Sequence, residues 1–286
     1  MRIDAHQHFW EMARFDYPWM PPAPSVLRQS LLPPLFGRIL ARNRFDASVL
    51  VQAATEIDET RWLLGLADEY PFIAGVVGWV DLTDPRVGEV LDEFQRHPKF
   101  KGVRHPVHDE SDPEWLLRAD VERGLEEVAR RDLAYDLLIR PPHLAMVPRL
   151  AERLPGLRMV IDHLAKPRIA DGILEGWARA IEEAAQIPSV FVKISGLITE
   201  DRPGEWSAER IRPFVSHALE CFGPDRAMFG SDWPVCLEAG NWKHTLAAFT
   251  QSIGPRSEEV REKLLAGTAL GFYRLDGSGL TLTSRK

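Results

Sequence analysis

The sequence lacks several features that would place it in a specialised class of protein. It has only two cysteines, Cys221 and Cys236, and they do not form a CxxC pair, so we expect reduced thiols rather than a disulfide framework. The longest apolar run covers residues 72–80 and is too short to cross a bilayer. The N-terminal Met1 and Arg2 are followed by no apolar segment typical of a signal peptide, so the sequence predicts a cytoplasmic location.

The chain also lacks an excess of basic residues. Its 35 lysines and arginines are outnumbered by 42 aspartates and glutamates, which gives a net charge of −7. No basic face is therefore predicted to recruit nucleic acid or an anionic membrane. Hydrophobic residues make up 45% of the chain, which is ordinary for a globular protein with a large core. Composition leaves the oligomeric state open, a homo-oligomer included.

What the sequence does contain is a regular alternation of short apolar runs and amphipathic segments. The apolar runs predict strands buried on both faces, as in a parallel sheet, at residues 3–8, 48–52, 73–80, 102–104, 135–139, 159–163, 190–195 and 228–231. Helical patterns occur at residues 56–70, 86–96, 114–131, 142–154, 173–186, 208–221, 242–253 and 257–265.

Eight strands that alternate with helices predict an α/β fold, a single (β/α)8 TIM barrel over residues 1–286. A doubly wound open sheet is disfavoured because no GxGxxG turn follows the first strand. The proline-rich segment 18–34 has no periodicity, and we expect it to form a long ordered loop on the active-site face.

Four ionisable side chains stand at the ends of three predicted strands. His6 and His8 are two residues apart at the end of the first run, so they are expected to face the same side. His163 ends the sixth run and Asp232 follows the eighth, which adjoins the first strand in a closed barrel. Three imidazoles and one carboxylate suit a single divalent metal, zinc first, and they also suit a metal-free acid–base cluster.

Seven segments spread over nearly the whole chain form a specific series. They are DAHQHFW, FIAGVVGWV, KFKGVRH, DLLIRPPHL, VIDHLAKP, VKISGLITE and DRAMFGSDWPV. The series resembles the amidohydrolase superfamily, in particular its lactonase group, which includes L-fuconolactonase and L-rhamnonolactonase. This resemblance implies a barrel and a carboxylic-ester hydrolase whose active-site core is His6, His8, His163 and Asp232.

The sequence departs from the wider superfamily at the residues that bridge two metals in many of its members. The fifth run offers only Asp136, and the seventh offers Lys193 and Ser195. We therefore expect at most one divalent metal per chain, and catalysis without metal stays open.

The leading hypothesis is hydrolysis of a sugar lactone to the open aldonic acid. Asp232 would take a proton from the attacking water and return it to the ring alkoxide. A metal, or the imidazoles together with Arg104, would stabilise the oxyanion, so the predicted catalytic residues are Asp232, His163 and Arg104. The candidates for substrate binding are Trp10, Arg104, His108, Arg140 and Lys166.

Three other functions stay open. Metal-dependent decarboxylation would need a firmly bound metal and an anchor for a carboxylate. An anionic dicarboxylate lactone would be the substrate if Arg104 and Arg140 both enter the pocket. The third is a barrel that binds a sugar acid without chemistry. A neutral aldonolactone such as L-fuconolactone, L-rhamnonolactone or L-galactonolactone is preferred, because few cationic groups lie at the predicted strand ends.

Overall fold

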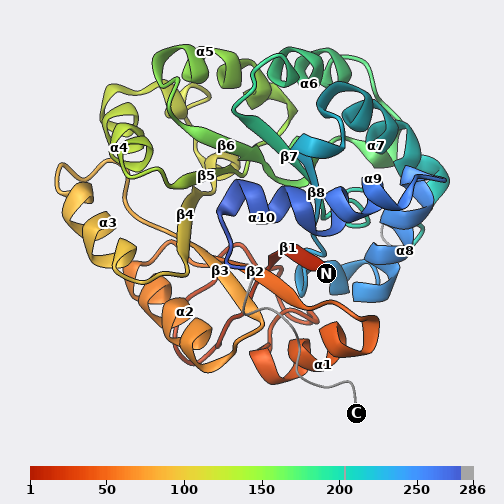
Figure 1. Ribbon diagram of the computed structural model, residues 1–286, viewed down its shortest axis with the longest axis horizontal. Helices are drawn as coiled ribbons and strands as arrows, with labels where there is room; N and C mark the ends of the chain where they lie inside the picture. The colour runs from red at the N-terminus through yellow and green to blue at the C-terminus, as the bar shows by residue number, and fades with distance from the viewer. Residues whose placement is uncertain (203, 278–286) are drawn as a thin grey trace.

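The computed structural model describes residues 1–202 and 204–277, which form a closed barrel of parallel strands (Figure 1). The strands pair in the order of the sequence, from β1 to β8. Their bounds are Ile3–Gln7 (β1), Ala47–Val51 (β2), Ile73–Gly78 (β3), Phe100–His105 (β4), Ala134–Leu137 (β5), Arg158–Ile161 (β6), Val190–Ile194 (β7) and Ala227–Phe229 (β8). Each lies at a predicted apolar run, which confirms the (β/α)8 fold.

The barrel is closed by backbone hydrogen bonds between β1 and the segment that follows β8. His8 N donates to Trp233 O over 2.7 Å, and Asp232 N donates to His6 O over 2.9 Å. Residues predicted to form the site thus join the two ends of the sheet. This closure sets Asp232 directly beside His6 and His8.

Helices surround the barrel (Figure 1). They are Pro33–Asn43 (α1), Ile57–Glu69 (α2), Val87–Gln95 (α3), Ala119–Arg130 (α4), Met146–Arg153 (α5), Trp177–Ala185 (α6), Ala208–Phe222 (α7) and Trp242–Ile253 (α8). Helix α1 was not predicted, because Pro33 and Pro34 stand at the end of the predicted loop. Proline in the first turn is favourable, since that turn has no use for the missing N–H group.

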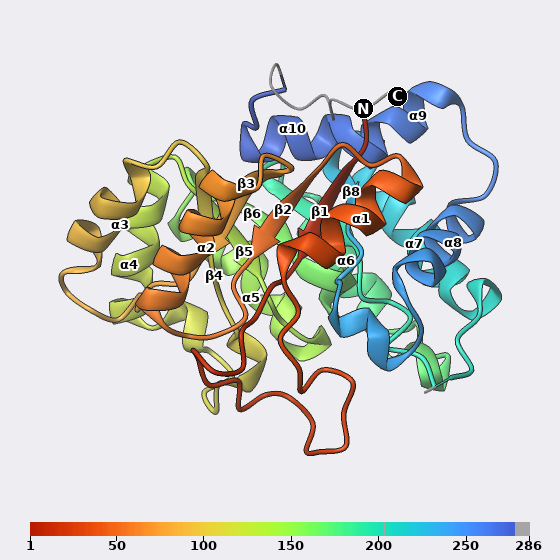
Figure 2. The same cartoon turned by 90° about the horizontal axis from the view of Figure 1, so that it is seen from below.

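The C-terminal segment closes the barrel at the N-terminal ends of its strands. Helix α9 (Glu258–Glu262), a π-helical turn (Lys263–Gly267) and α10 (Thr268–Tyr273) continue beyond the predicted 257–265. Phe272 and Tyr273 belong to an apolar cluster with Ala5, Val49 and other inward-facing strand residues. In Figure 2 these helices lie opposite the long segment between β1 and α1, which projects beyond the other end of the barrel. The predicted site lies at that other end.

None of the helices within the described ranges is long and apolar enough to cross a membrane.

Candidate active site

An irregularity in β1 turns His6 into the barrel. Ala5 belongs to the apolar cluster inside the barrel, while the next residue, His6, contacts Lys193 of the facing β7. Two consecutive inward residues break the alternation of a regular strand, and the register of β1 with β2 shifts between Asp4 and Gln7. The apolar bottom of the barrel therefore changes to a polar layer within one residue.

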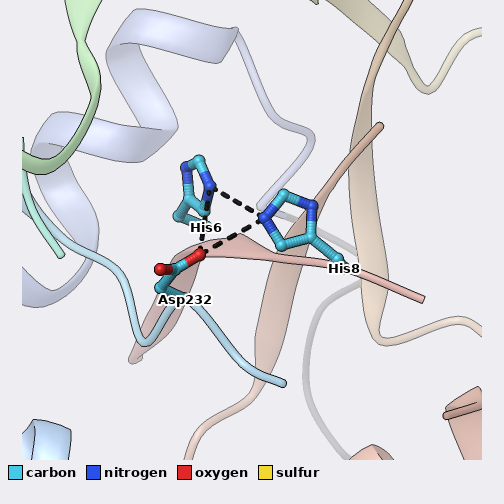
Figure 3. A group of neighbouring side chains, drawn as sticks. All are labelled: His6, His8 and Asp232. Atoms are coloured by element: carbon cyan, nitrogen blue, oxygen red, sulfur yellow. Dashed lines mark hydrogen bonds and ion pairs between the residues drawn. The ribbon is translucent and has the colours of Figure 1, made fainter. Parts of the chain in front are cut away.

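His6, His8 and Asp232 form a compact triangle of potential ligand atoms (Figure 3). The Nε2 atoms of His6 and His8 are 3.2 Å apart, and Asp232 Oδ1 lies 3.7 Å from the first and 3.3 Å from the second. Ligands at about 2.1 Å from a tetrahedral ion are about 3.4 Å from one another. The triangle therefore fits the spacing of three ligands around one ion.

The orientation of His8 also suits a ligand. Its Nδ1 lies 2.8 Å from Val51 O, and because a carbonyl can only accept, Nδ1 carries the proton. The lone pair on Nε2 then points to Asp232 and His6. A second hydrogen bond of this kind is typical of histidines that bind metal.

His163 reaches the same point through strained backbone. Its φ is +54°, and the next three residues also have positive φ, which is rare outside glycine. This turn lets Asp162 and His163 both face His6, with His6 Nδ1 3.3 Å from Asp162 Oδ1 and the two imidazole rings 4.5 Å apart. His163 Nδ1 lies 2.8 Å from Ser195 Oγ, and its Nε2 lies 4.0 Å from Asp232 Oδ1.

Asp232 is held in a similar way. Its φ is +56°, and the residue is only 2% exposed. Burial alone would raise the pKa of this carboxyl, but interaction with His163 and a hydrogen bond with His8 outweigh burial and lower it. Asp232 is therefore ionised at neutral pH, which is the state required of a base.

The three histidines are neutral. Burial is the main cause that lowers the pKa of His6 and His163 well below the usual range and the pKa of His8 to a smaller degree. Neutral imidazoles can bind metal or accept a proton, so the site suits both uses.

Beneath the triangle lies a layer of buried charged residues that were not among the predicted site residues. Lys193 Nζ lies 2.5 Å from Asp136 Oδ2, 3.0 Å from Asp162 Oδ1 and 3.0 Å from His6 Nδ1. Tyr273 OH donates to Asp136 from α10, at 2.9 and 2.8 Å from its two oxygens. The sequence signal was a charged residue inside an apolar run, which must find a partner in the fold.

Arg104, one of the residues predicted to be catalytic, enters the barrel from β4. Its Nη1 lies 3.2 Å from Asp162 Oδ2 and 3.3 Å from His6 Nε2. Its Nε and Nη2 donate to Gln52 Oε1 over 3.1 and 2.7 Å, and Nη2 also donates to Gln52 O. The guanidinium is thus fixed beside the site and largely compensated by its partners.

His108, Lys166 and Arg140, which were also predicted to bind substrate, differ in burial and in their partners. Burial is the main cause that lowers the pKa of His108 to about 3, and the positive charges of Lys166, Arg140 and Arg104 lower it further. Lys166 Nζ is paired with Glu200 Oε1 over 2.8 Å, and Arg140 is exposed.

Trp10 is not brought into this group. It is fully buried, and its Nε1–H donates to Leu27 O and Gln29 O at 3.1 and 2.8 Å. Its backbone pairs with that of Leu31, so Trp10 helps to hold together the two ends of the long segment between β1 and α1.

Glu59 is a further buried carboxyl near the carboxyl end of β2. Its Oε2 accepts from Ala53 N over 3.0 Å and from Ala54 N over 2.8 Å, while Oε1 has no hydrogen-bond partner among the described residues. Burial raises its pKa to about 8 despite these bonds. Glu59 therefore supports the chain directly after Gln52, the partner of Arg104.

The barrel and its mouth of three histidines and one aspartate define an amidohydrolase. A sequence model of the amidohydrolase family matches residues 3–275, and the chain belongs to this family. This confirms the resemblance found in the seven sequence segments.

The most informative relatives are lactonases. The chain is 38% identical over 282 residues to an L-fucono-1,5-lactonase of Burkholderia ambifaria, and the alignment covers 96% of each chain. It is 37% identical over 289 residues to an L-fucono-1,5-lactonase of Burkholderia multivorans, again with 96% of each covered. A crystal structure of an amidohydrolase from Burkholderia multivorans with bound zinc is 37% identical, has a TM-score of 0.91, and is matched over 96% of this chain and 100% of that chain.

Proposed function

We propose that this protein hydrolyses the ester ring of a neutral sugar lactone, with L-fucono-1,5-lactone as the first substrate to test. The observation that carries the proposal is the position of Asp232, an ionised carboxylate within 3.3–4.0 Å of three neutral imidazoles at a barrel mouth. The names of the two full-length relatives support the substrate class.

Asp232 performs the proton transfers in this mechanism. It takes a proton from water as the water attacks the lactone carbonyl, and it then delivers that proton to the ring oxygen as the carbonyl–oxygen bond breaks. One carboxylate serves both steps because they occur in sequence. Gly196 and Ser195 pack against His163, and the backbone of His6 binds Asp232 N, so the groups around Asp232 are fixed before substrate arrives.

One divalent metal, zinc first, fits the site. His6, His8 and Asp232 would hold it, because their ligand atoms have the spacing described above. His163, whose Nε2 lies 4.0 Å from Asp232 Oδ1, is the candidate for a fourth ligand. When bound, the metal polarises the lactone carbonyl and lowers the pKa of water. Without it, Arg104 and the imidazoles are the groups that lie close enough to donate to the oxyanion.

Charge compensation favours a neutral substrate. Arg104 is tied to Asp162 and Gln52, and Lys166 to Glu200, so only Arg140 among the predicted cations is exposed and has no carboxylate within ion-pair distance in the described residues. A dicarboxylate would call for several convergent free cations. The hydroxyl groups of a sugar lactone need mixed donors and acceptors, which His108, Lys166 and Glu200 supply.

The substrate class is tested by kinetics on matched lactones. We expect kcat/KM for L-fucono-1,5-lactone, L-rhamnonolactone or L-galactonolactone to exceed that for an anionic dicarboxylate lactone. The reverse order would keep the lactonase assignment and overturn the neutral substrate. Release of CO2 from an aromatic or dicarboxylic acid, without lactone turnover, would instead support decarboxylation. A cytoplasmic location and a homo-oligomer stay predictions.

A further inference from the structure

The ammonium group of Lys193 has a complete set of partners inside the barrel. An ammonium has three N–H donors and no acceptor. Three acceptors surround it: Asp136 Oδ2 at 2.5 Å, Asp162 Oδ1 at 3.0 Å and His6 Nδ1 at 3.0 Å. Lys193 is fully buried, so water does not compete for these contacts. His6 Nδ1 is therefore placed to accept a hydrogen bond from Lys193.

His6 Nδ1 also has a neighbour of the opposite kind. Asp162 Oδ1 lies 3.3 Å away and can only accept. A neutral imidazole has one proton, which sits on either Nδ1 or Nε2. If Nδ1 accepts from Lys193, the proton is on Nε2; if Nδ1 donates to Asp162, Nε2 keeps a free lone pair.

The position of the His6 proton matters because Nε2, on the other edge of the ring, faces His8. His8 Nδ1 donates to Val51 O, so His8 Nε2 is an acceptor, and it lies 3.2 Å from His6 Nε2. A proton on His6 Nε2 therefore completes a chain of donors that runs from Lys193 through His6 and His8 to Val51. A proton on His6 Nδ1 breaks this chain and leaves a lone pair on both Nε2 atoms. The lone pair of His6 then accepts from Arg104 Nη1, 3.3 Å away, unless an ion takes the place of that contact.

We propose that Lys193 is a positioning residue that holds His6 in its Nε2–H tautomer and so weakens metal binding at the mouth, whereas Asp162 and Arg104, the acceptor at Nδ1 and the donor at Nε2, act in the opposite direction. No proton is gained or lost between the two tautomers; only its place on the ring changes. The inference rests on the proposed metal position, and it accounts for a site whose ligand spacing suits an ion while His6 and His8 are hydrogen-bonded to each other without one.

Two variants test the two directions. Lys193→Met combined with Asp136→Asn removes the ammonium and one carboxylate, so the net charge is kept, and the amide introduced by Asp136→Asn can still accept from Tyr273. We expect its zinc affinity, measured by competition with a chromophoric chelator, to rise at least about 10-fold. Asp162→Asn replaces the charged acceptor for Nδ1–H by a neutral, weaker amide oxygen, and we expect zinc affinity to fall by about 10- to 100-fold. A merely structural role would lower both affinities.

The tautomer is read independently of metal. In [15N]histidine spectra of the metal-free protein, with His6 assigned by its loss in His6→Asn, we expect wild-type His6 to be Nε2–H and the double variant to be Nδ1–H. The wild-type spectrum needs no variant of the charged layer to fold. An Nδ1–H tautomer in wild type, or a double variant that binds zinc no more tightly, would overturn the proposal. No zinc binding in any variant would overturn the metal position and the affinity claim, while the spectra would still report the tautomer.

Discussion

The mouth of the barrel and the layer beneath it use the same kinds of residues in different ways. In the lower layer, the Lys193 ammonium is matched by Asp136, Asp162 and His6, and Asp136 is matched again by Tyr273. At the mouth, the Nε2 atoms of the histidines and the Asp232 carboxylate face mainly one another.

This difference distinguishes the residues that support the site from those that take part in the reaction. A compensated buried charge fixes geometry, because moving it leaves a partner without a hydrogen bond at a cost of several kcal/mol, in the range of about 3–5. At the mouth, the ionised Asp232 carboxylate and the Nε2 lone pair of His8 can instead take up a proton, an ion or a substrate. We infer that the mouth performs the reaction and that the lower layer orients it.

The largest effect is expected from the carboxylate at the mouth. Asp232→Asn should lower kcat on a sugar lactone by at least about 100-fold, because the proton shuttle is lost. Asp92→Asn, on the outer helix α3, removes the same charge far from the mouth and should keep near wild-type turnover. A folded Asp232→Asn protein with wild-type kcat would remove Asp232 from the mechanism.

A smaller loss is expected from displacement of the groups at the mouth. A Cβ at Gly196 would lie 2.7 Å from His163 Nδ1 and 3.0 Å from Asp232 Oδ2, so Gly196→Ala should lower kcat/KM by roughly 10- to 100-fold. Gly172→Ala is the matched control, since its φ of +67° is close to the +65° of Gly196 but nothing lies within 4 Å of its Cβ. Equal losses in both variants would assign the effect to backbone strain alone.

The lower layer should respond in stability rather than in turnover. Tyr273→Phe removes a hydrogen bond to a buried carboxylate and should lower the free energy of unfolding by about 1.5–3 kcal/mol, with kcat changed only a few-fold. Tyr135→Phe is the control, because the Tyr135 hydroxyl is also buried and has no partner in the described part of the chain. Denaturant unfolding of both variants measures this, and a large fall in kcat with unchanged stability in Tyr273→Phe would contradict the division of roles.

The effect expected to change turnover least is the pH dependence that Glu59 gives to stability. Its folded pKa of about 8 lies above the unfolded value of 4.5, so the folded state holds a proton that the unfolded state has lost between these values. Stability contributed by this group is therefore lost as pH rises from about 4.5 to about 8. Glu59→Gln should gain thermal stability over wild type at about pH 8.5 compared with about pH 5, whereas exposed Glu152→Gln should show no such trend. A pH-independent difference for Glu59→Gln would refute the raised pKa.

The mouth and the lower layer also differ in how much of each could be predicted from the sequence. The four residues predicted at the mouth stand at strand ends, where a polar residue after an apolar run is visible along the chain. The buried charges were harder to assign, because Lys193 is neutralised by Asp136 and Asp162, and Asp136 is in turn hydrogen-bonded by Tyr273 of α10. Nothing in the local sequence specifies these partners. The expected alternation of inward and outward side chains also fails at two places. At Ala5–His6 an irregular strand places consecutive residues on the inner side, and at Asp162–His163 left-handed backbone does so.

The central claim is that water opens the ring of a neutral sugar lactone by attack on its carbonyl. Hydrolysis of L-fucono-1,5-lactone in 18O-labelled water tests this most directly, with the spontaneous reaction subtracted. We predict enzyme-dependent formation of the aldonic acid with one labelled oxygen in its carboxylate and none in the released ring hydroxyl. Label in the hydroxyl, or no product above the spontaneous reaction, would contradict the account.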